Sequence, residues 1–204
     1  MTVTVTRWWW VRHAPLLAPP GIIAGRADLP CDLSDPAALD ALAARLPRGA
    51  MWIATPLSRT RDTARALLDR MGEVAEPAIE PAFLEQDFGD WQGRTHGDIG
   101  DGEGVAAFWR DPAGNTPPGG QSFAALAAQV AAGIDRVTAA RAGRDIVCVA
   151  HAGPIRAAVG YALGLSPERM LALAVDCLHI CRLDRIDGEG LPVWRVAGVN
   201  LPPR

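Results

Sequence analysis

An apolar run that ends in a cation and an imidazole constrains this chain more than any other stretch. Residues Val3 to Val11 are rich in β-branched and aromatic side chains, a composition that predicts a strand buried on both faces. Arg12 and His13 follow, and Pro15 cannot continue the strand. We therefore expect His13 at the carboxyl end of a buried strand, where sheets of mainly parallel strands form their ligand sites. Taken alone, such a pair is equally compatible with a strand that simply has a polar end.

The rest of the chain alternates predicted strands and helices. Helix signals cover 34–46, 58–71, 121–141 and 153–164, and strand signals cover 50–54, 78–84 and 145–150. Pro81 restricts the 78–84 strand to a sheet edge or ends it early, and residues 178–183 and 194–199 predict a hairpin. We therefore predict an α/β fold in three layers, with a mostly parallel central sheet, helices on both faces and an antiparallel edge hairpin near the C-terminus.

We expect one domain over residues 1–204, because no internal repeat or break in composition divides the chain. Residues 86–120 depart from the alternating pattern. Glycine, proline and acidic residues punctuate this segment, with one short helix expected around 105–110. Long irregular insertions in compact domains tend to carry function, so we expect this excursion to lie over an active site.

Composition excludes several classes of function. All 20 basic residues are arginine, so Schiff-base chemistry and a Walker-type phosphate loop, which need a lysine, are ruled out. A net charge of −3 without a basic patch argues against a nucleic-acid partner. The apolar runs are too short for a membrane helix, and the N-terminus lacks a signal-peptide pattern. The four cysteines lack the spacing of a metal site. We therefore expect a cytoplasmic protein with reduced thiols. Monomer and homodimer both stay open.

Chemically active side chains follow four of the predicted strands. Arg12 and His13 follow the first strand, Arg59 the second, Glu85 the third, and His151 the strand at 145–150. If these strands are parallel, the side chains meet at one edge of the sheet. Arginines bind phosphate oxygens through forked hydrogen bonds, a neutral imidazole can attack phosphorus, and a carboxylic acid can protonate a leaving group. The set predicts phosphoryl transfer that needs no metal and no cofactor.

Each member also has a purely structural interpretation. Arg59 shares its predicted helix with Arg61 and Arg65 and could belong to a solvated face. Glu85 could be a surface carboxylate, and His151 a core histidine bonded to the backbone. A metal site is a further alternative, although these residues lack a compact ligand motif and the neighbouring arginines would repel a cation.

Five segments in order resemble the motifs of the histidine phosphatase superfamily, the phosphoglycerate-mutase-like fold. They are Val-Arg-His-Ala at 11–14, Thr-Pro-Leu-Ser-Arg-Thr-Arg-Asp-Thr-Ala at 55–64, Leu-Glu-Gln-Asp-Phe-Gly-Asp-Trp-Gln-Gly at 84–93, Pro-Pro-Gly-Gly-Gln-Ser at 117–122 and Val-Ala-His-Ala-Gly-Pro-Ile-Arg at 149–156. The resemblance extends from Trp10 to about Leu165. It implies that His13 is the phosphorylated nucleophile, that Glu85 is the proton donor, and that the phosphate pocket consists of Arg12, Arg59 and His151.

The chain departs from the family pattern beside both histidines. Ala14 and Ala152 stand where the family usually has glycine, and apolar residues at 16–17 replace the usual polar ones. A backbone that needs a positive φ at either alanine would be strained. We expect Gly25 and Arg26 to substitute for the missing phosphate contacts of the first loop, and Ala152 to remain part of the phosphate site.

Charge in the excursion bears on the substrate. Residues 87–111 contain two arginines against six acidic residues. This disfavours binding of a second phosphate and favours hydrolysis of a small, less charged phosphomonoester over phosphoglycerate mutase chemistry. Trp91, Phe108 and Trp109 in the same segment are candidates for stacking on an aromatic ring of the substrate, with anchoring of the excursion as the alternative role. Residues 21–30 are also similar to a loop of α-ribazole phosphatases, which implies α-ribazole 5′-phosphate as a substrate. A general or protein-directed phosphatase, a mutase, and a pseudo-enzyme that binds phosphorylated ligands without turnover stay open.

Overall fold

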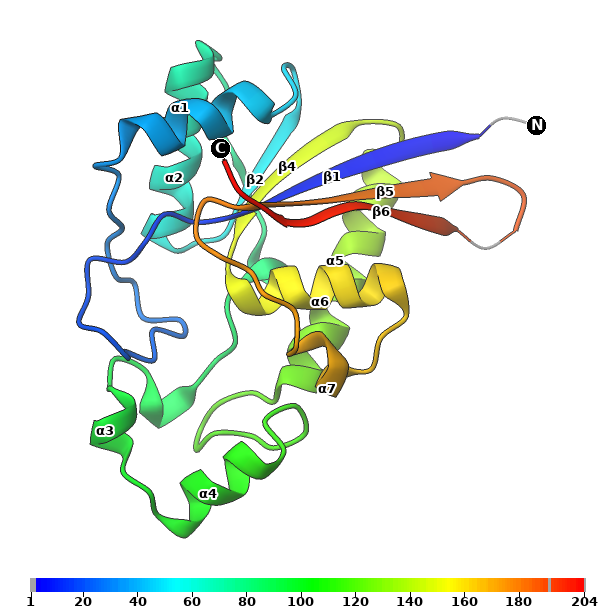
Figure 1. Cartoon of the computed structure of the whole chain (residues 1–204). Helices are drawn as coiled ribbons and strands as arrows, with labels where there is room; N and C mark the ends of the chain where they lie inside the picture. The colour runs from blue at the N-terminus through cyan, green and yellow to red at the C-terminus, as the bar shows by residue number, and fades with distance from the viewer. Residues whose placement is uncertain (1–2, 191, 204) are drawn as a thin grey trace.

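A computed structural model describes residues 3–190 and 192–203 and shows a six-stranded sheet in the order β3-β2-β4-β1-β5-β6 (Figure 1). The four strands β3, β2, β4 and β1 are parallel to one another. Strand β5 is antiparallel to β1, and β6 is antiparallel to β5. The strands are β1 (Thr4–Arg12), β2 (Met51–Ala54), β3 (Ala78–Ile79), β4 (Asp145–Ala150), β5 (Ile180–Asp187) and β6 (Val193–Leu201).

Helices cover both faces of this sheet. On one face lie α1 (Pro36–Arg45) and α2 (Ser58–Met71), and on the other α5 (Phe123–Ala140) and α6 (Ala152–Leu163), with the short α7 (Pro167–Met170) beside α6 (Figure 1). Each face has its own hydrophobic core. The predicted three-layer α/β fold with a mostly parallel sheet and an antiparallel edge hairpin is confirmed.

The apolar runs of β1 and β4 follow from burial on both faces of the sheet. Trp8 and Trp10 point into the core under α5 and α6, where their rings stack 5.2 Å apart, while Trp9 packs against the opposite core. In β4, Cys148 and Val149 likewise face opposite cores. A strand buried on both sides has no polar face, so its sequence shows no alternation.

Helix ends agree with the sequence signals where glycine fixes them. Gly72 ends α2 with φ 63°, and Gly164 ends α6 with φ 65°, both in the left-handed region that glycine adopts at low cost. Helix α1 begins two residues later than predicted, because Asp35 caps it by accepting the N–H of Ala38. At the sheet edge, β3 has only two residues, since Pro81 begins a 3₁₀ turn.

The excursion at 86–120 extends away from the sheet (Figure 1). It contains a 3₁₀ turn at Gly89–Trp91 and two helices, α3 (His96–Ile99) and α4 (Glu103–Arg110). A small separate cluster of Ile23, Trp91 and Phe108 ties it to the loop after β1. In the part of the chain that the structure describes, no helix is both long and apolar enough to cross a membrane.

Candidate active site

The parallel pairing of β1 with β4 brings the two predicted site histidines together. Arg12 pairs with Ala150, and the N–H of His13 donates to the carbonyl oxygen of Ala150 at 3.0 Å. His13 and His151 therefore follow neighbouring strands at the same sheet edge. Their ring centroids lie 5.2 Å apart with an interplanar angle of 63°.

His13 is held as a neutral imidazole with one defined tautomer. Its Nδ1 lies 2.6 Å from the carbonyl oxygen of Ala14, which can only accept, so Nδ1 carries the proton. Burial lowers the pKa of His13 to about 3, with smaller contributions in the same direction from Arg59 and Arg12, opposed by the bond to Ala14. The ring is consequently uncharged at neutral pH, and the lone pair of Nε2 is free to attack an electrophile.

His151 is fully buried and takes the opposite tautomer. Arg59 donates from Nε to Nδ1 of His151 at 3.3 Å, so Nε2 carries the proton and lies 2.9 Å from Oγ1 of Thr55. Thr55 Oγ1 in turn lies 3.0 Å from Oγ1 of Thr60, which donates to the carbonyl of Leu57 at 2.9 Å. Burial holds the pKa of His151 well below its usual value, with smaller electrostatic contributions in the same direction from the neighbouring His13, Arg59 and Arg12.

Thr55 and Thr60 belong to the site although the sequence alone does not single them out. Thr55 directly follows β2 and Thr60 lies in the first turn of α2, and both are fully buried. A hydroxyl at a strand end beside a predicted catalytic arginine is the signal that could have identified them.

Arg59 is not on a solvated face, because only 1% of its surface is exposed. Its two Nη atoms donate to the carbonyl oxygens of Ala27 at 2.6 Å and Gly25 at 2.7 Å. The loop at 25–27 therefore fixes the guanidinium in the plane from which it also contacts His151. Each Nη atom keeps a second hydrogen for a further acceptor.

Arg12 enters the same cluster from β1. Its Nη1 donates to the carbonyl oxygen of Val175 at 2.6 Å. Its Nε is buried and has no partner among the described residues. A guanidinium that is anchored at one end and keeps a buried free donor is well placed to bind an anion.

Glu85 completes the cluster from the segment after β3. Its Oε1 accepts the backbone N–H groups of Gly153 at 3.1 Å and Gln86 at 3.0 Å. Burial raises the pKa of Glu85, against the opposing effects of the Gln86 N–H, Arg12 and Arg59. The site thus combines an uncharged base at His13 with a carboxyl group whose pKa is raised by burial.

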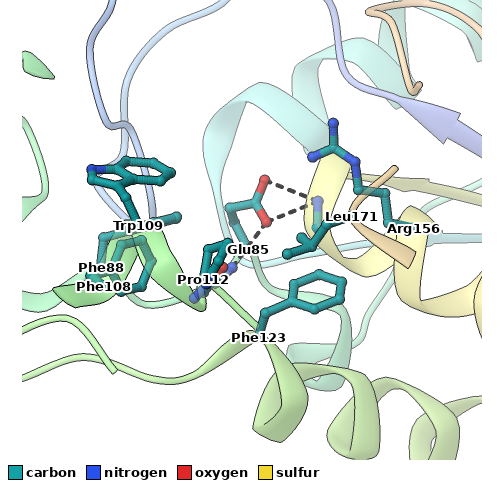
Figure 2. Close-up of a pocket in the computed structure, with 10 residues that line it drawn as sticks. Glu85, Phe88, Phe108, Trp109, Pro112, Phe123, Arg156 and Leu171 are labelled. Carbon is teal, nitrogen blue, oxygen red and sulfur yellow. Dashed lines mark hydrogen bonds between the residues drawn. The ribbon is translucent and has the colours of Figure 1, made fainter. Parts of the chain in front are cut away.

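A cavity of about 330 Å³ adjoins Glu85. Figure 2 shows Phe88, Phe108 and Trp109 together on one side of the carboxyl group and Arg156 on the other. These three rings come from the excursion, so this segment forms a wall beside the proposed proton donor. Arg156 ends the motif at 149–156, and the sequence pattern assigns it no role of its own.

The structure gives the remaining predicted substrate residues supporting positions. The carbonyl of Gly25 orients Arg59, and the guanidinium of Arg26 is engaged by the carbonyl of Glu85 at 3.0 Å, by Asp87 at 3.3 Å and by Gln121 at 3.0 Å. Ala152 begins α6 directly after His151. Trp91 is 5% exposed within the cluster of Ile23 and Phe108, and it is not among the residues that line the cavity.

The two alanines that replace family glycines are unstrained. Positive φ angles at non-glycine positions occur at Leu178 and Asn200 in the described chain, and neither Ala14 nor Ala152 has one. The N–H of Ala14 donates to Oγ1 of Thr63 at 3.0 Å. Within the described residues, no group of three or more His, Cys, Asp or Glu side chains is arranged to hold a metal ion.

Comparisons with known proteins agree with this arrangement. Residues 8–198 match the histidine phosphatase superfamily (branch 1). A glucosyl-3-phosphoglycerate phosphatase of Mycolicibacterium vanbaalenii is 34% identical over 182 residues, covering 80% of this chain and 79% of the relative. An adenosylcobalamin/alpha-ribazole phosphatase of Salmonella typhimurium is 31% identical over 153 residues, covering 72% and 74%.

A solved structure of a mycobacterial glucosyl-3-phosphoglycerate phosphatase has the same fold. It superposes with a TM-score of 0.82 at 26% identity, over 97% of this chain and 99% of that protein. Family motifs, strand topology and overall fold therefore agree. The chain belongs to the histidine phosphatase superfamily (branch 1).

Proposed function

We propose that this protein hydrolyses a small phosphomonoester without a metal, through a phosphohistidine formed on His13. The observation that best supports this proposal is the neutral His13 ring, whose proton is held on Nδ1 by the carbonyl oxygen of Ala14. Burial lowers the pKa of His13, and the nearby Arg59 and Arg12 lower it further. In this proposal Arg12, Arg59 and His151 bind the phosphoryl group. Glu85 is the proton donor.

In the first step, Nε2 of His13 attacks phosphorus and the bond from phosphorus to the ester oxygen breaks. Glu85 transfers its proton to the departing oxygen, so the alcohol leaves neutral. Negative charge spreads over the three remaining phosphoryl oxygens, where fixed arginines stabilise it without reorganising. The raised pKa of Glu85 supports this role, because the group must be protonated when substrate binds.

In the second step, the Glu85 carboxylate takes a proton from water as the water oxygen attacks phosphorus. The nitrogen–phosphorus bond breaks, and inorganic phosphate leaves. His13 recovers its lone pair and Glu85 its proton, so both groups return to their starting states. Gly25 and Arg26 support Arg59 and the base of the excursion, Ala152 lies beside the phosphate site, and Trp91 anchors the excursion.

Charge around the cavity supports hydrolysis over mutase chemistry. Arg156 is the one cation among the described residues that line it, which provides little to hold a second phosphate. Relatives named for α-ribazole and for glucosyl-3-phosphoglycerate make α-ribazole 5′-phosphate and glucosyl-3-phosphoglycerate the first metabolites to assay. We further propose that residues 1–204 form one domain and, since all four cysteines are free thiols, that the protein works in the cytoplasm.

The test is hydrolysis of 4-nitrophenyl phosphate between pH 5 and 8 with a chelator present. We expect turnover that the chelator leaves unchanged. Binding of orthovanadate without any turnover would instead indicate a pseudo-enzyme. Exchange of phosphate between phosphoglycerates would indicate a mutase, and a panel of phosphorylated metabolites with both named candidates identifies the substrate.

A further inference from the structure

The cavity beside Glu85 has two chemically different walls. The excursion contributes Phe88, Phe108 and Trp109, whose rings form an apolar wall (Figure 2). Opposite them, α6 contributes Arg156. Because Glu85 lines the cavity and is the proposed donor to the departing oxygen, this space lies on the side of the leaving alcohol.

Arg156 is fixed in place but keeps free donors. Its Nε donates to the carbonyl oxygen of Leu173 at 2.8 Å, which sets the plane of the guanidinium. Neither Nη atom has a hydrogen-bond partner within residues 3–190 and 192–203. Arg156 lies three residues after Gly153 on α6, so both are on the helix face that meets Glu85.

The electrostatics of the cavity favour a ligand with one negative charge. Burial lowers the pKa of Arg156, while the nearby Glu85 carboxyl raises it. An arginine nevertheless remains charged at any physiological pH. Since Arg156 is the one cation that the described residues contribute to the lining, it can balance a carboxylate, whose two oxygens match the fork of a guanidinium.

We propose that Arg156 determines specificity by binding a carboxylate on the leaving alcohol, while Phe88 and Trp109 contact a flat, unsaturated carbon framework. The preferred substrates are then phosphomonoesters of carboxylated, planar alcohols. This inference rests on the proposed hydrolysis at His13, with which it shares Glu85. Aromatic rings give large contact areas at low entropic cost, so the apolar wall contributes affinity and Arg156 contributes selection.

The test compares phenyl phosphate with 3-carboxyphenyl phosphate. A meta carboxylate barely changes the acidity of the phenol, so the two esters differ mainly in charge. We expect wild type to show a kcat/KM at least about tenfold higher for the carboxylated ester, a ratio worth about 1.4 kcal/mol. Arg156→Gln should bring this ratio close to one by slowing the carboxylated ester alone. Arg110→Gln, a change at an exposed arginine of α4 outside the cavity lining, is the matched control.

Two further measurements distinguish the possible failures. Calorimetry with 3-hydroxybenzoate and phenol reports the subsite without any turnover, and only the carboxylated ligand should bind more weakly to Arg156→Gln. Arg156→Lys, which keeps the charge but not the fork, should give an intermediate ratio. A wild-type ratio near one, or equal losses for both esters with weaker inhibition by orthophosphate, would overturn the proposal. Selective binding of 3-hydroxybenzoate by a protein that hydrolyses neither ester would support this subsite and refute the proposed hydrolysis.

Discussion

Gly153 donates its backbone N–H to Oε1 of Glu85 across 3.1 Å, joining two segments that are 68 positions apart in the chain. A Cβ atom added at Gly153 would lie 2.2 Å from the same oxygen. Only glycine therefore lets α6 approach the carboxyl group closely enough to hold it. Glycine is required at position 153 because Glu85 lies so close to it. Its backbone conformation imposes no such requirement, since the φ of Gly153 is not positive.

Gly153→Ala should displace Glu85 and lower kcat by at least about tenfold, with a loss of stability of about 1–3 kcal/mol from overpacking. The measurements are steady-state kinetics and urea unfolding. Ala152→Gly is the matched control, because Ala152 has an ordinary φ, and it should retain most of the activity. Unchanged kinetics in Gly153→Ala would contradict the assigned position of Glu85.

His13→Ala should abolish both turnover and covalent labelling of the protein by a ³²P-labelled phosphomonoester. Phosphohistidine is labile in acid and stable in alkali, so the reaction is stopped in alkali and the label is then released in acid. His96→Gln, a change at an exposed histidine of α3, should still be labelled. Retention of either signal in His13→Ala would rule out this nucleophile.

Glu85→Gln should slow alkyl phosphates more than 4-nitrophenyl phosphate. An alkoxide needs a proton to leave, whereas nitrophenolate leaves readily without one. General acid catalysis contributes roughly 10²- to 10⁴-fold, so we expect a loss of that order for the alkyl ester and a much smaller one for the nitrophenyl ester. Glu103→Gln, at an exposed acid of α4, serves as the control. An equal loss for both esters would argue against Glu85 as the donor.

His13 should make the folded protein less stable in mild acid. Burial lowers the pKa of His13 from 6.5 to about 3, so between these pH values the unfolded chain binds a proton that the folded chain does not. The free energy of unfolding then decreases as pH falls through this window, by up to about 1.4 kcal/mol per pH unit for each such proton.

Urea unfolding at pH 6.5 and pH 4.5 measures this effect. His13→Gln should lose less stability than wild type between the two pH values, by about 2–3 kcal/mol. His151, whose pKa is also lowered, acts in the same direction in both proteins, and Glu85, whose pKa is raised, acts in the opposite direction in both. The difference between the proteins therefore isolates His13, and identical pH dependences would show that its pKa is not lowered.

Thr55→Val should leave the N–H of His151 Nε2 buried without an acceptor. A lost partner of this kind costs about 1–3 kcal/mol of stability, and a reoriented His151 would also release Nε of Arg59. We expect lower stability and a higher KM for the phosphomonoester. Thr55→Ser keeps the hydroxyl and should restore both values, whereas equal behaviour of the two variants would exclude the hydroxyl as the cause.

Much of the fold is predictable because local signals and burial agree. The continuous apolar runs of β1 and β4 indicate strands covered on both faces, and Gly72 and Gly164 mark helix ends within one residue. The signal is weakest at 78–84, where Pro81 leaves two residues of strand. The predicted meeting of the site residues at one sheet edge also required the strands to be parallel. The pairings of β1 with β4 and of β2 with β4 are parallel.

Hydrogen-bond partners cannot be read from the sequence, because they depend on which distant segments meet. Trp91, Phe108 and Trp109 are all sequence candidates for stacking on the substrate, and only tertiary packing separates them. Trp91 is buried beside Ile23 away from the cavity, whereas Phe108 and Trp109 line it. Arg26 is a sequence candidate for binding phosphate, but Asp87 and Gln121 engage its guanidinium. Neither outcome has a local cause.

The sequence by itself determined where the strands and helices lie and therefore which side chains stand at each strand end. These signals are local, because they depend on neighbouring residues and on the pattern of burial along the element. Only the tertiary structure decided what each group does there. It places Ala14 against Nδ1 of His13, directs Arg59 to His151 and brings Gly153 to Glu85. The physical reason is that protonation states and tautomers depend on burial and on partners that lie far away in the chain.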